Sequence, residues 1–183
     1  MNQLKEYTDK QLQTALQLLE TFTPGADEEI IHQLRVSLKK IKAVLLFIST
    51  LHPAKAKQIR KKVQLLFRAA GSIREAQLQL QWLKKKRYLH LIEAASLEKK
   101  IAEDEELFLQ QKKRFFKMLT SIREDLLKQT HKVKADMVTD YIIKLKDELY
   151  KQLHHVVKDE WHEFRKLGKQ LLFAYHWISE KDK

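Results

Sequence analysis

The sequence predicts an all-α protein built from long helices, and three observations lead to this fold class. The 183 residues contain only three glycines and two prolines, fewer than the tight turns of a β-rich chain would need. Hydrophobic residues make up 44% of the chain, which is enough for a core between several helices. Apolar side chains recur at helical spacing, as Leu12, Leu16 and Leu19 do in the first segment.

Helix-breaking residues divide the first half of the chain into four expected helices. Thr23-Pro24-Gly25 and His52-Pro53 mark two boundaries, and Gly71-Ser72 is expected to mark a third. The acidic residues from Asp27 to Glu29 suit the first turn of the second helix. The expected helices therefore cover residues 4–22, 27–51 and 54–69, with a fourth after the break and up to about residue 86.

The second half is harder to divide, because residues 88–128 are almost all good helix formers. Further helices are expected over about residues 134–157 and 158–179, before a short charged tail. A chain of this length is typical of one domain. We therefore expect a single domain over residues 1–183, with one helical half at about 1–87 and a second at about 88–183.

The charge of the chain favours an anionic partner. Thirty-six Lys and Arg against 24 Asp and Glu give a net charge of +12, which suits nucleic acid, lipid headgroups or a phosphate polymer. The absence of cysteine excludes disulfides and thiolate metal sites. The first ten residues lack the pattern of a secretory signal, and no apolar stretch approaches the roughly 20 residues of a membrane span. We expect a cytoplasmic protein without a membrane partner.

A basic motif, H-x-x-R-x-x-x-K, occurs twice in the chain. The two copies begin at His32 and His162, 130 positions apart. At about 100° per residue, the three basic positions of each copy lie within a sector of about 60° on one helix face. Lys42 extends the first copy by another turn, whereas Leu172 stands at the matching position of the second. Each expected helix therefore carries one basic stripe, and the stripe is shorter in the second copy.

Each basic stripe borders an apolar face, so the cations are expected beside the core. Their aliphatic stems then pack while the charged heads converge on a groove between helices. A lone histidine in a helix is usually a surface or core residue. The recurrence of His32 and His162 with Arg and Lys at fixed offsets favours a binding role instead. The spacing suggests an internal duplication, for which a pseudo-two-fold arrangement is the simplest geometry. Zinc binding is disfavoured because no thiol ligands stand nearby, and no metal site is expected.

At these residues the sequence resembles the CHAD family, named for its histidine-containing α-helical domain, and the resemblance covers nearly the whole chain. The first family motif resembles residues 32–42, the glycine-to-arginine turn of the family resembles residues 70–75, and the second motif resembles residues 162–169. The resemblance implies two antiparallel bundles of about four helices each, related by pseudo-two-fold symmetry around a central basic channel. It also implies binding of inorganic polyphosphate in that channel, without established catalysis.

Carried over position by position, the resemblance assigns phosphate contacts to eight residues: His32, Arg35, Lys39, Lys42, Arg74, His162, Arg165 and Lys169. The family often has Asp where Glu75 stands, and commonly a basic residue and a tyrosine where Leu172 and Phe173 stand. We therefore expect weaker binding by the second half. The expected role is a non-catalytic module that needs no cofactor and targets polyphosphate deposits.

Two alternatives belong to other functional classes. A helical nucleic-acid-binding protein would use the same basic surface, because attraction to a phosphate backbone depends little on the polymer. Against it, basic and aromatic residues are little interleaved, and no known nucleic-acid-binding signature is present. An enzyme acting on phosphate anhydrides would need magnesium-binding carboxylates beside the cations. The nearest are Glu75 and Glu163, which salt bridges to Arg74 and Lys166 explain more simply.

Overall fold

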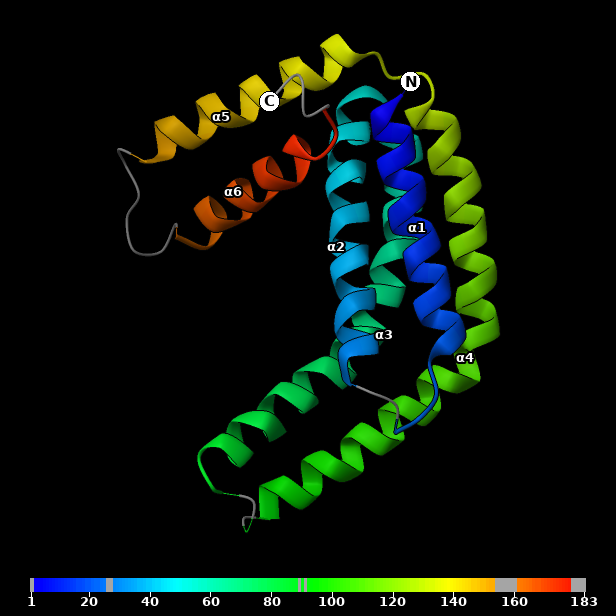
Figure 1. Ribbon diagram of the computed structural model, residues 1–183, viewed down its shortest axis with the longest axis vertical. Coiled ribbons are helices and arrows are strands. Elements are labelled where there is room, and N and C mark those ends of the chain that lie inside the picture. Colours follow the sequence, from blue (N-terminus) through cyan, green and yellow to red (C-terminus); the bar gives the residue numbers. More distant parts are fainter. Residues whose placement is uncertain (1, 26–27, 89, 91, 154–160, 179–183) are drawn as a thin grey trace.

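The computed structural model describes residues 2–25, 28–88, 90, 92–153 and 161–178, and this part of the chain contains helices and no strands. The all-α prediction is confirmed. Six helices lie within the described residues (Figure 1). They are α1 (Gln3–Thr21), α2 (Glu28–Leu51), α3 (Pro53–Lys85), α4 (Ile92–Thr130), α5 (Ala135–Leu153) and α6 (Trp161–Tyr175).

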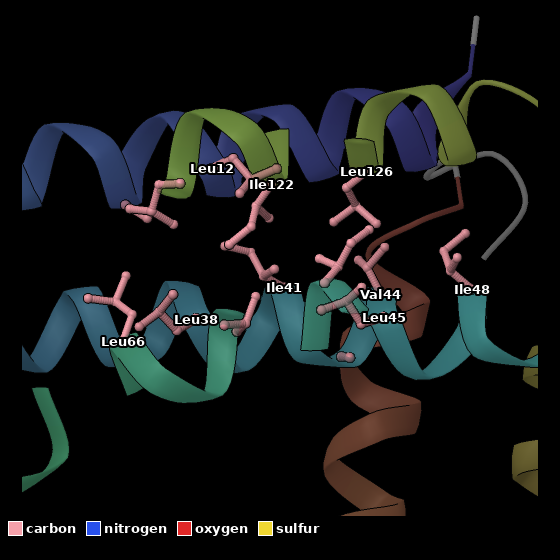
Figure 2. Packing of buried hydrophobic residues seen from close by; sticks show 14 of the residues in the cluster. Leu12, Leu38, Ile41, Val44, Leu45, Ile48, Leu66, Ile122 and Leu126 are labelled. Carbon is pink, nitrogen blue, oxygen red and sulfur yellow. The ribbon is translucent and has the colours of Figure 1, made fainter. Parts of the chain in front are cut away.

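The first four helices form one bundle. Helix α1 packs against α2 and α4, and α3 packs against the same two helices from the other side. Figure 2 shows Leu12 from α1, Ile41 from α2 and Leu126 from α4 pointing into the shared core. All three side chains are fully buried. The apolar spacing predicted for the first helix, in which Leu12 and Leu19 are completely buried, thus marks the face that the bundle covers.

The link between α1 and α2 is tied to α4 by polar contacts. Gly25 has a φ of 71°, a left-handed conformation that a residue with a Cβ adopts at a cost. Its N–H donates to Oε2 of Glu105 at 2.8 Å, and that carboxylate is buried. Lys112 donates to the carbonyl of Phe22 at 2.9 Å. Helix α4 therefore completes the bundle of the first half, although all of it lies in the expected second half.

Two helical arms extend from the same side of the bundle (Figure 1). One arm is the hairpin of α5 and α6, which meets the bundle through contacts between α6 and α2. The other, green in the figure, is formed by the last part of α3 and the first part of α4. The two arms give the molecule a concave side, with α2 at its base.

The expected break at Gly71-Ser72 is wrong, because α3 runs without interruption from Pro53 to Lys85. A glycine inside a helix costs about 0.5–1 kcal/mol relative to alanine. Burial of Ala70 and Ile73 on either side of this turn outweighs that cost.

The expected pair of symmetric four-helix bundles around a central channel is not confirmed. The bundle takes up α1 to α4, and α5 and α6 form a helical hairpin. Helices α5 and α6 lie inside the expected ranges of 134–157 and 158–179. Three of the expected boundary residues, 157, 158 and 179, lie outside the described residues, and so does Asp27.

Within the described part of the chain, no helix is both long enough and apolar enough to cross a bilayer.

Candidate functional site

The first basic stripe lies on α2 between the core and the concave side. Leu34, Leu38 and Ile41 on the inner face of α2 are completely buried. His32, Arg35 and Lys42 on the neighbouring face are half-buried, and Lys39 is more exposed. The cations border the core, as their spacing in the sequence indicates.

Arg35 is held on α3 by two contacts with one residue. Its Nη1 donates to the carbonyl oxygen of Phe67 at 3.1 Å, and its guanidinium lies 4.3 Å from the centroid of the Phe67 ring. The ring attracts the cation through its quadrupole, and the carbonyl fixes the direction of one N–H group. Arg35 is thus placed before any ligand arrives.

Gly71 makes room for this arginine. A Cβ built at Gly71 would overlap Nη1 of Arg35, so any larger residue there displaces the guanidinium. The glycine that the sequence suggested as a helix break instead lets a side chain from α2 pass close over the backbone of α3.

Lys42 contacts the same aromatic ring. Its Nζ lies 4.6 Å from the centroid of Phe67, so this ring contacts two cations that are about two turns apart on α2. Sequence reasoning missed Phe67. The available signal was its position four residues before Gly71, which places both residues on one face of α3.

The second basic stripe acts on the first across the gap between α2 and α6. Partial burial and the nearby cations Arg35, Lys169, Arg165 and Lys42 lower the pKa of Lys39. The two copies of the motif, distant in sequence, therefore bring their charges to one region. This juxtaposition is what an anion-binding surface requires.

Two cations outside the predicted set belong to the same region. Burial lowers the pKa of Lys42, and the charges of Arg60, Arg35 and Lys166 lower it further. Arg60 lies on α3 and Lys166 on α6. Neither follows the motif spacing, so the sequence alone gave no reason to select them among 36 Lys and Arg.

Burial also lowers the pKa of Arg35, while the charge of Glu75 opposes this effect. The carboxylate that stands after the turn arginine thus acts on the cation from α2. The expected salt bridge between Glu75 and Arg74 is replaced by another pairing. Nη1 of Arg74 lies 3.5 Å from Oε2 of Glu28, at the start of α2, and the Arg74 side chain is only 15% exposed. Arg74 therefore ties α3 to α2.

A buried glutamine positions the second stripe. Nε2 of Gln170 donates to the carbonyl of Ala43 on α2 at 2.9 Å and to the hydroxyl of Tyr141 on α5 at 3.1 Å. Gln170 follows Lys169 directly, so this anchor fixes the turn of α6 that carries the last cation of the motif. The amide thereby gives hydrogen-bond partners to polar groups whose burial without a partner would cost free energy.

The other cations of α6 are exposed. His162 and Arg165 are exposed, and Lys166 makes the expected ion pair with Glu163, with Nζ and Oε1 2.6 Å apart. Both partners are largely exposed, so this pair adds little to the stability of the helix.

Charge–charge interactions thus connect five of the eight predicted residues: Arg35, Lys39, Lys42, Arg165 and Lys169. Arg74 lies beside Arg35 but is committed to Glu28. His32 and His162 lie one turn before the arginine of their respective stripes. Among the described residues, no group of three or more histidines and carboxylates is placed to hold a metal ion.

Comparison with protein families matches residues 6–180 of the chain to the CHAD domain. Neither a curated protein nor a solved structure matches it. The family match includes both copies of the basic motif, helices α2 to α6 in full, and α1 from Glu6 onward.

Proposed function

The chain belongs to the CHAD family, and from that premise we propose that it binds inorganic polyphosphate on the concave side of the molecule. CHAD domains in general are linked to polyphosphate binding. The proposed site is the basic surface, by which we mean the cations that α2, α3 and α6 bring together: Arg35, Lys39, Lys42, Arg60, Arg165, Lys166 and Lys169.

The crowding of cations around Lys39 carries this proposal. Partial burial lowers the pKa of Lys39, and charges from α2 and α6 lower it further, so the folded protein holds like charges together at an energetic cost. A bound polyanion removes that cost, because each phosphate compensates the repulsion between neighbouring cations. Part of the free energy of binding then comes from relieving the repulsion between these cations in the protein without ligand.

The composition of the basic surface suits a phosphate polymer. Polyphosphate presents negative charge at regular intervals and offers no bases to read, so recognition depends on cations spaced along a path. Arginine binds phosphate oxygens through two parallel N–H groups, whereas lysine acts as a mobile point charge. A polymer that is partly enclosed between helices is also screened less by salt than one on an open surface.

We propose a binding module without catalysis, which needs no cofactor. Its proposed place is the cytoplasm, at polyphosphate deposits, where the domain would bring the chain to the polymer. Nucleic acid is the secondary partner, because its backbone is attracted by the same charges.

The decisive experiment compares two polyanions. Long-chain polyphosphate and single-stranded DNA of equal charge are titrated at near-physiological salt against the wild type and the double variant Arg35→Ala/Arg165→Ala. We expect the wild type to prefer polyphosphate and the double variant to lose at least about tenfold in affinity, the effect of roughly one charge-assisted hydrogen bond.

A matched control removes two exposed positive charges from α4 instead, in the variant Lys113→Ala/Arg114→Ala. The net charge of this control equals that of the test variant, so it isolates position from charge. Equal affinity for the two polymers, or equal losses of affinity in the two double variants, would contradict the proposal. Either result would show that the basic surface attracts anions without selectivity.

A further inference from the structure

A groove with a cavity volume of about 690 Å³ runs along the side of α3 that meets Arg35. Phe67, Gly71, Arg74, Leu78 and Trp82 follow one face of the helix at spacings of three or four residues. Fifteen positions separate Phe67 from Trp82, an axial length of about 22 Å at 1.5 Å per residue. The groove is long enough for an extended ligand.

The end of the groove next to the bundle is cationic. Arg35 and the exposed Arg68 line it, together with the partly buried Arg74. Since Arg74 pairs with Glu28, the two cations directed to a ligand are Arg35 and Arg68. This end suits phosphate groups and is continuous with the basic surface at Arg35.

The middle of the groove is polar and contains hydrogen-bond acceptors. Glu75 and Gln79, one helical turn apart, both line it and are exposed. A carboxylate disfavours phosphate at this point, but it accepts hydrogen bonds from sugar hydroxyls, the use that nucleotide-binding folds make of an acidic residue. Gln79 adds an amide that donates and accepts.

The far end of the groove is apolar and aromatic. Leu78 and Trp82 line it with 50% and 56% of their surfaces exposed. The Trp82 ring lies 6.3 Å from that of Tyr88, at the end of the same arm. An inorganic phosphate chain has no apolar group to cover these side chains, whereas a nucleobase stacks on exposed aromatic rings.

We infer that this groove binds a nucleoside polyphosphate. The base stacks on Trp82 beside Leu78, the sugar hydroxyls bond to Glu75 and Gln79, and the phosphates extend toward Arg68 and Arg35. The order of the lining residues along α3 matches the order of chemical groups in this ligand. The inference rests on the proposed function only at Arg35, which the groove shares with the basic surface.

The test compares ATP with inorganic tripolyphosphate, which has the same number of phosphates and no base, by calorimetry without metal. We expect the wild type to bind ATP about tenfold more tightly, because stacking on one aromatic side chain is worth about that factor. Trp82→Ala should abolish this preference while leaving the affinity for tripolyphosphate within about twofold of its original value. Trp82→Leu keeps apolar volume without the aromatic face, and should lose the preference without loss of folding.

Trp161→Ala is the matched control, because Trp161 on α6 is 57% exposed and lies outside the groove. It should retain the preference for ATP. Equal affinities of the wild type for the two ligands, or equal effects of the two tryptophan variants, would overturn the inference. Failure of the proposed function would give a different result. Long-chain polyphosphate would then not bind selectively, but ATP binding would still depend on Trp82.

Discussion

The same basic motif meets two different environments in this molecule. On α2, Arg35 and Lys42 lie against the ring of Phe67, beside a helix face that is buried in the bundle. On α6, Arg165 and Lys169 are exposed, and the helix packs mainly against α5 and less extensively against α2. Motif spacing therefore determines which face of a helix carries the cations, whereas packing determines how firmly they are held.

This difference has an energetic consequence for binding. A side chain that is already fixed loses little conformational freedom when a ligand arrives, while a mobile lysine or arginine loses more. The α2 stripe should therefore contribute more of the binding free energy than the α6 stripe, although both carry the same residue types. Three pairs of variants test this comparison.

The largest effect is expected from the two arginines taken singly. Arg35→Ala should weaken polyphosphate binding about tenfold and Arg165→Ala only about threefold, because Arg35 is positioned by Phe67. Fluorescence anisotropy with labelled polyphosphate at several salt concentrations measures both. The salt dependence should fall by the same amount in each variant, since each loses one cation. Equal losses of affinity would show that positioning on the ring is irrelevant.

A smaller effect is expected from the two helical glycines. Gly71→Ala should lower polyphosphate affinity about threefold, because the added methyl group displaces Arg35, whose charge remains nearby. Gly168→Ala on α6 meets no atom within 4 Å and should leave affinity unchanged. It should also stabilise the fold by about 0.5–1 kcal/mol through helix propensity, measurable by urea unfolding. Similar affinities for the two variants would contradict the assigned role of Gly71.

The smallest effect concerns stability. The pKa of Lys39 is lowered by partial burial and then by its cationic neighbours, so the charged lysine disfavours the folded state at neutral pH. Lys39→Met should raise the thermal midpoint without ligand by at most about 2 °C, because solvent screens the charge of this exposed side chain, and it should weaken polyphosphate binding. This gain in the thermal midpoint should shrink as the pH rises from the lowered pKa of Lys39 toward the ordinary lysine pKa, because Lys39 of the wild type loses its charge over that range.

Lys169→Met sharpens that measurement, because it removes one of the charges that act on Lys39 and leaves the partial burial of Lys39 unchanged. It should change the thermal midpoint less than Lys39→Met does. A fall in the midpoint of Lys39→Met, or a gain that does not depend on pH, would show that the crowded cations do not disfavour the empty fold.

Much of the candidate site could be predicted from periodicity alone. The offsets among Arg35, Lys39 and Lys42 place them on one side of a helix wherever that helix packs, and the apolar residues beside them indicate which side faces the core. The facing of the two stripes toward a common region was a hypothesis at that level. The electrostatic effect of Arg165 and Lys169 on Lys39 supports it.

The sequence by itself determined the helical class, the faces of the helices and the membership of the family, because each depends on residues close together in the chain or on the pattern as a whole. Only the tertiary structure decided that α3 continues through Gly71, that Arg74 pairs with Glu28, and that Phe67 holds two cations. These contacts join segments that are far apart in sequence. Their geometry depends on how helices pack, and local propensity contains no information about which distant side chain fills a given space.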